Sequence, residues 1–234
     1  MKKNLQEDKK RISERQKLVI GLILAFIAVT IVFITEQVFK AGYAVKTVVK
    51  VISFMGAIGL YCAITGKRFI DVIRLRRIKN IKPIIIWMVF FFAGMTAAFF
   101  IFRRFIDLGS IRESLIAKEN LTKSNCLFVF AYIILCNSFL EESFFRGFYS
   151  GIFPNKRVGT VCSAVVFSLY HIGIFVTWFS PFIFIICIAG LTAVGIFLQW
   201  LSDKFESILA SYITHACANV VLNIIGALMI FEVI

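Results

Sequence analysis

The 234-residue sequence has few charged residues, three prolines and two histidines. Charged residues make up 17% and apolar residues 60%, whereas soluble domains average about 25% and about 45–50%. This composition argues against a disordered chain, a collagen-like repeat and an ordinary soluble enzyme. The sequence also has no internal repeat of roughly 20–50 residues and no linker rich in Pro, Gly and Ser. We therefore expect one helical membrane domain.

Cysteine pairs of the C-x-x-C type are absent, and the six cysteines lie in or beside apolar segments. We expect them to be buried free thiols. The 26 basic residues outnumber the 13 acidic ones and gather between apolar runs. No basic patch outside those runs carries interleaved aromatic residues, so the charge excess favours contact with anionic lipid over binding of nucleic acid.

Long apolar runs dominate the rest, and about 20 apolar residues suffice for a transmembrane helix. The sequence predicts an all-α fold, a polytopic membrane helix bundle of about seven transmembrane helices. The second span is the weakest, because it carries Lys46 and Lys50 near its start. Both side chains could extend to the membrane interface. The predicted spans are residues 18–34, 43–64, 83–102, 125–153, 158–175, 181–201 and 207–230.

Positive charge orients these spans. Residues 1–17 form a basic segment that we expect in the cytosol, and the basic loop between the second and third spans falls on the same side. The N-terminus is then cytosolic and the C-terminus outside. Residues 103–123 do not fit this orientation, because they carry five positive charges and would lie on the outer side. We expect an interfacial helix there. Residues 18–124 thus form the N-terminal helices, and residues 125–234 carry the polar core.

Two adjacent glutamates, Glu141 and Glu142, lie inside the fourth span. Acidic residues in membrane helices are costly and usually functional. Glu142 and Arg146 are four residues apart and share a helix face, so they can form an ion pair. Glu141 points elsewhere and would be free for chemistry. The alternative is that both glutamates merely neutralise Arg146.

Both histidines, His171 and His215, also lie inside apolar segments. A lone buried histidine is more often a satisfied core residue than a base. Asn219 follows His215 by one turn on the same face, and Phe167 precedes His171 by one turn, where its ring would help exclude water. At about 1.5 Å per residue, Glu141 and both histidines lie roughly 16–22 Å from the predicted inner ends of their helices. We therefore expect them to meet in one intramembrane pocket.

Three motifs in this order resemble the CPBP family of intramembrane proteases, which includes CAAX-processing and bacteriocin-processing enzymes and is also called the abortive-infection family. The resemblance covers about residues 120–225. The motifs are E-E-x-x-x-R from Glu141 to Arg146, F-x-x-x-H from Phe167 to His171, and H-x-x-x-N from His215 to Asn219.

The resemblance implies a glutamate-dependent endopeptidase of the cell membrane that acts on membrane-associated peptides or proteins without a cofactor or catalytic metal. Glu141 would activate water with help from His171, and His215 and Asn219 would stabilise the oxyanion. The choice of Glu141 as the base rests on the resemblance and on the pairing of Glu142 with Arg146, and it leaves open which glutamate is the base. No H-E-x-x-H sequence supports a zinc site.

Two other functions fit buried Glu and His residues. A proton-coupled transporter is one, although no inverted repeat is visible. A non-catalytic membrane protein, such as a bacteriocin immunity protein or a partner of a sensor kinase, is the other. The intact set of Glu, His, His and Asn favours chemistry. The substrate and the oligomeric state are not predicted.

Overall fold

The computed structural model describes residues 12–172 and 179–233. All regular secondary structure in this part of the chain is helical. Among these residues, six helices are long and apolar enough to cross a membrane. The protein is therefore a multi-pass membrane protein built as a helix bundle, as predicted. The spans are Glu14–Gln37, Tyr43–Thr65, Lys82–Phe105, Cys126–Tyr149, Pro181–Lys204 and Ile208–Ile230.

A seventh helix, α9 (Lys156–Tyr170), corresponds to the predicted span 158–175. It has 15 residues, or about 22 Å at the α-helical rise, and packs along α11 (Pro181–Lys204). Gly195 of α11 allows this close packing, because a Cβ there would lie 3.0 Å from the Cα of Ala164. Part of the predicted span, residues 173–178, lies outside the described residues. With α9 included, the prediction of about seven membrane helices holds.

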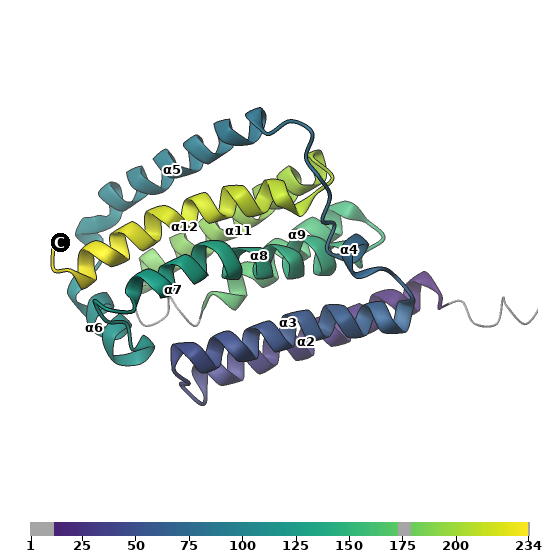
Figure 1. The fold of residues 1–234 in the computed structure, drawn as a ribbon, viewed down its shortest axis with the longest axis horizontal. Helices are drawn as coiled ribbons and strands as arrows, with labels where there is room; N and C mark the ends of the chain where they lie inside the picture. The colour runs from purple at the N-terminus through teal and green to yellow at the C-terminus, as the bar shows by residue number, and fades with distance from the viewer. Residues whose placement is uncertain (1–11, 173–178, 234) are drawn as a thin grey trace, which may run out of the picture.

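The helices run alternately along one axis (Figure 1). The start of α2 (Glu14–Gln37) and the end of α12 (Ile208–Ile230) lie at opposite ends of the bundle. We call the end that holds the loop between α3 (Tyr43–Thr65) and α5 (Lys82–Phe102) the basic end of the bundle. The turn that leads into α9 and the turn between α11 and α12 lie at the same end (Figure 1).

Short polar contacts fix the loop at the basic end, which also contains the short helix α4 (Phe69–Val72). Arg74 forms a 2.6 Å ion pair with Asp203, and the Ser207 hydroxyl donates to the Arg76 carbonyl at 2.6 Å. Gly147 makes this docking possible, because a Cβ there would lie 2.6 Å from the Ile73 carbonyl oxygen.

The predicted interfacial segment contains the turn η2 (Arg103–Phe105) and the helix α6 (Leu108–Glu119), at the end opposite the basic end (Figure 1). Asp107 caps the start of α6 by accepting from the Ser110 amide, and Asn120 ends it in a left-handed conformation. Whether α6 lies at the lipid surface stays a prediction.

The fourth span is one continuous helix in which α-helical and π-helical segments alternate. Its α-helical pieces are α7 (Cys126–Tyr132) and α8 (Ser138–Glu141), and its π-helical pieces are η3 (Ile133–Asn137) and η4 (Glu142–Tyr149). π-helical turns are rare and are frequent at functional sites. Here they flank Glu141 and contain Glu142 and Arg146.

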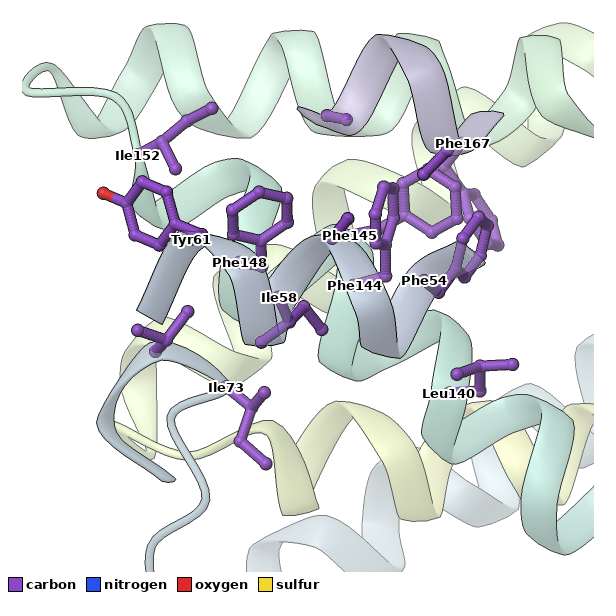
Figure 2. Packing of buried hydrophobic residues seen from close by; sticks show 14 of the residues in the cluster. Phe54, Ile58, Tyr61, Ile73, Leu140, Phe144, Phe145, Phe148, Ile152 and Phe167 are labelled. Carbon is purple, nitrogen blue, oxygen red and sulfur yellow. The ribbon is translucent and has the colours of Figure 1, made fainter. Parts of the chain in front are cut away.

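The core forms where α3 packs against η4 (Figure 2). Phe54 of α3 stacks on Phe144 with ring centroids 4.0 Å apart, and Tyr61 meets Phe148 edge-on at 5.2 Å. Phe145 in turn contacts Phe167 of α9 at 5.2 Å. These fully buried aromatic rings fix η4 between α3 and α9, so that the polar residues of η4 are held in a rigid setting.

Candidate active site

The two glutamates point to different partners inside the bundle. Glu141 is 2% exposed, and one of its oxygens, Oε2, lies 4.0 Å from His171 Nε2 and 3.9 Å from His215 Nε2. These histidines come from the end of α9 and from α12. Three helices therefore converge on one carboxylate oxygen. The separations are too long for direct hydrogen bonds.

The other oxygen of Glu141, Oε1, is held by two donors. Asn137 Nδ2 donates to it at 3.0 Å, and Lys50 Nζ of α3 lies 3.5 Å away. Lys50 also donates to Asn137 Oδ1 at 3.0 Å. The carboxylate thus has one side fixed by protein donors and the other side turned to the imidazoles.

Glu142 is fully buried and has a different environment. Its Oε1 accepts from His215 Nδ1 at 3.0 Å, and its Oε2 lies 3.6 Å from Arg146 Nε. The predicted pair of Glu142 and Arg146 is therefore formed. Glu142 also orients His215, a contact that the sequence did not predict.

Arg146 is fully buried and makes further contacts with α9. Its guanidinium lies 4.3 Å from the ring centroid of Phe167, and its NH1 donates to Ser163 Oγ at 3.5 Å. Ser163 donates in turn to the Phe145 carbonyl at 2.8 Å. A cation over an aromatic face is stabilised when it is removed from water. Arg146 therefore joins the glutamate helix to α9.

The hydrogen bonds of the two imidazoles assign their tautomers. His171 Nδ1 lies 2.7 Å from the Phe167 carbonyl oxygen, and His215 Nδ1 lies 3.0 Å from the Glu142 carboxylate. Carbonyl and carboxylate oxygens only accept, so Nδ1 is the donor in both rings. In the neutral form of each histidine, Nε2 then carries a lone pair that faces Glu141. Phe167 lies edge-on to His171 with centroids 4.6 Å apart, as its spacing predicted.

Asn219 lies one turn beyond His215 on α12 and contacts the glutamate helix before Glu141. Its Nδ2 donates to Ser138 Oγ at 2.9 Å, and Ser138 donates to the Ile133 carbonyl at 3.0 Å. Asn223, a further turn along, is buried, and its Nδ2 has no hydrogen-bond partner among the described residues. Asn219 is thus oriented by the helix that carries the glutamates, whereas Asn223 is not.

A metal ion fits this arrangement poorly. Zinc ligands lie about 2.0–2.1 Å from the metal, which places tetrahedral donors about 3.4 Å apart. The Nε2 atoms lie farther than that from Glu141 Oε2, and two cations, Lys50 and Arg146, accompany the carboxylates. Within residues 12–172 and 179–233, no group of three or more His, Cys, Asp or Glu side chains lies at metal-binding spacing.

The segment that carries these residues is similar to a known protein family. Residues 123–221 match the family model described as type II CAAX prenyl endopeptidase Rce1-like. This segment of the chain is therefore similar to the CPBP family. No curated protein matches the chain. No solved structure matches it.

The matched segment starts just before α7 and ends within α12, so it contains all six predicted site residues. The structure gathers five of them into one cluster, in which each lies within 4.0 Å of at least one other: Glu141, Glu142, Arg146, His171 and His215. Asn219 joins them through Ser138.

Lys50 was not predicted from the sequence as a site residue, and it lies outside the matched segment. The expectation that its side chain extends to the membrane interface is wrong, because only 14% of that side chain is exposed and it points to Asn137 and Glu141. The spacing of Lys50 along its helix could have indicated this inward position. Lys50 precedes the buried residues Phe54 and Ile58 at spacings of four and eight, so it lies on the core-facing stripe of α3.

Proposed function

We propose that the chain is an intramembrane endopeptidase that hydrolyses a peptide bond of a membrane-associated substrate with water activated by Glu141. The observation that carries the proposal is the convergence of two imidazole Nε2 atoms on Glu141 Oε2. The family match supports the hydrolase class, since the family model is described as a CAAX prenyl endopeptidase. The buried site supports a substrate that reaches it from the membrane.

Glu141 suits the role of general base better than Glu142. Its Oε2 faces both histidines, whereas Oε2 of Glu142 faces Arg146 inside the fully buried core. A base must lie within hydrogen-bond reach of the proton it removes, directly or through one water. Water held between Glu141 Oε2 and His171 Nε2 would transfer its proton to Glu141. The hydroxide oxygen would then bond to the carbonyl carbon.

That step moves the carbonyl π electrons onto oxygen, and the oxyanion needs donors. Asn219 Nδ2 is one donor, oriented by Ser138. His215 is the other. Its Nδ1 already donates to Glu142, so its Nε2 donates only when the ring is protonated. Cleavage of the C–N bond would follow, with the proton on Glu141 passing to the leaving amine.

The proposal predicts a graded loss of activity. Full-length protein in liposomes is incubated with two fluorogenic peptides, one farnesylated with a CAAX end and one unprenylated with an apolar segment. Glu141→Gln lowers the cleavage rate by about 10²–10⁴, because the general base is lost. Asn219→Ala lowers it by about 10²–10³, because one oxyanion donor is lost. Both variants retain the folded state, measured by their melting temperatures.

Asn223→Ala is the matched control, since it removes a buried asparagine one turn along the same helix. It leaves the cleavage rate within a few-fold of the wild-type rate. The proposal is wrong if Glu141→Gln and Asn219→Ala both cleave at the wild-type rate. If Glu142→Gln abolishes cleavage without loss of stability while Glu141→Gln stays active, the two glutamates exchange roles. Cleavage of the farnesylated peptide alone identifies a prenylated substrate class.

A further inference from the structure

Lys50 brings a cation into the site from a helix outside the matched segment. Its Nζ lies 3.5 Å from Glu141 Oε1, donates to Asn137 Oδ1 at 3.0 Å, and lies 5.1 Å from the ring centroid of Tyr170. A lysine near the end of a membrane helix ordinarily extends its ammonium toward water. Here the ammonium turns toward buried polar groups.

The packing of α3 explains this orientation. Lys50 lies one turn before Phe54, on the stripe of α3 that continues through Ile58 to Tyr61. This stripe docks on η4 through the stacked rings of Phe54 and Phe144 (Figure 2). Once the rings are packed, the Lys50 side chain faces the helix that carries Glu141. Lys46, a turn earlier, instead forms a 2.6 Å ion pair with Glu119 of α6.

We propose that Lys50 is a positioning residue that fixes the Glu141 carboxylate for water activation, an inference that rests on the proposed function. Lys50 and Asn137 both engage Oε1, which leaves Oε2 directed at the two Nε2 atoms. A carboxylate held at one oxygen cannot rotate freely about its terminal torsion. The adjacent ammonium also favours the ionised carboxylate, the form that accepts a proton from water.

Other charged or titratable groups around Glu141 also act on the ionisation of its carboxylate. His171 and His215 face its Oε2, and Glu142 follows it in the chain with Arg146 as its own partner. Glu36 of α2 and Tyr170 of α9 also interact electrostatically with Glu141, and Glu36 interacts with Lys50 as well. Lys50 is the cation that faces Oε1. Its removal therefore changes the ionisation and the orientation of Glu141, while the groups around Oε2 stay in place.

The test compares Lys50→Met with Lys50→Arg, Lys50→Gln and the control Lys46→Met, all in the full-length protein in liposomes with the two peptides named above. We expect Lys50→Met to lower kcat about 10- to 100-fold with little change in KM, because a misplaced base slows the chemical step. The acidic limb of its pH–activity profile moves to higher pH, because the cation beside the carboxylate is lost. Lys50→Arg keeps a cation and recovers part of kcat. Lys46→Met behaves as the wild type does.

A merely structural role would lower the amount of folded protein and leave the pH profile of the remaining activity unchanged. A substrate-binding role would raise KM and leave kcat unchanged. Either result overturns the proposal. If Lys50→Met does not fold, Lys50→Gln replaces it, since Gln keeps a hydrogen-bond donor and removes the charge.

One measurement is independent of catalysis. Lys50→Met lowers the melting temperature, and adding Glu141→Gln restores part of the loss, because no unpaired carboxylate remains. Additive losses in the double variant show that Lys50 and Glu141 are not coupled and overturn the proposal. If the wild-type protein cleaves neither peptide, the proposed function fails, whereas this double-variant cycle still tests the Lys50–Glu141 pair.

Discussion

Replacing Arg146 with methionine leaves the Glu142 carboxylate inside the bundle without its cation. Both side chains are fully buried, and Arg146 Nε lies 3.6 Å from Glu142 Oε2. At an effective dielectric constant of 20, that separation corresponds to an attraction of about 5 kcal/mol. Removing one partner of a buried pair typically costs about 3–5 kcal/mol. The two figures agree, so we expect Arg146→Met to lower the free energy of unfolding by about 3–5 kcal/mol.

A second change should reverse much of this loss. Glu142→Gln removes the unpaired charge and keeps an oxygen that can accept from His215 Nδ1, so that the 3.0 Å contact survives. The double variant Glu142→Gln with Arg146→Met should therefore regain at least half of the lost stability. Cleavage need not return, because a neutral amide would then replace the carboxylate that orients His215.

The assay is chemical unfolding of the purified protein in detergent, followed by circular dichroism. Arg68→Met is the matched control, since the Arg68 side chain is 81% exposed and lies 3.9 Å from Asp71. An exposed pair contributes about 0–1 kcal/mol, so this control should unfold almost as the wild type does. The reasoning is refuted if Arg146→Met and the double variant lose the same free energy, because Glu142 would then not depend on Arg146 for its charge.

Three further predictions follow from the fold and the site. Gly147→Ala lowers the free energy of unfolding by about 1–3 kcal/mol, because the new Cβ would lie 2.6 Å from the Ile73 carbonyl oxygen. Gly151→Ala is the control and has little effect, because a Cβ at Gly151 has no neighbouring atom within 4 Å. Chelation of divalent metals leaves cleavage unchanged, and one zinc per chain with activity that follows the zinc would contradict the glutamate mechanism. Reporter fusions at Asp71 and at the C-terminus report opposite sides of the membrane, with Asp71 cytosolic; the same side for both would contradict seven crossings.

The lengths of the apolar runs predicted the positions of the long helices well. Six predicted spans match the six long helices to within a few residues at each end, with α2 beginning at Glu14 rather than at residue 18. Ser13 caps that helix by accepting from the Gln16 amide, which explains the earlier start. The π-helical winding of η3 and η4 was not predictable, because the residue pattern of an apolar run does not distinguish a π-helix from an ordinary α-helix.

Spacing within one helix predicted the pair of Glu142 and Arg146, since residues four apart share a face. Spacing along one helix does not predict contacts between different helices. The hydrogen bond from His215 to Glu142 and the approach of Lys50 to Glu141 join segments 73 and 91 residues apart. Such contacts depend on how the helices rotate and cross, which the buried aromatic rings of α3 and η4 decide.

The two cations explain how a membrane helix can hold adjacent glutamates. One arginine does not balance two carboxylates, and the structure provides a second cation, so that Glu142 faces Arg146 and Glu141 faces Lys50. These four side chains together carry no net charge, which lowers the cost of placing them in the bilayer. The two pairs differ in origin. Glu142 and Arg146 share one helix, whereas Glu141 gains its cation only when α3 docks on η4. The carboxylate proposed to activate water is therefore the one whose charge partner depends on the assembled bundle.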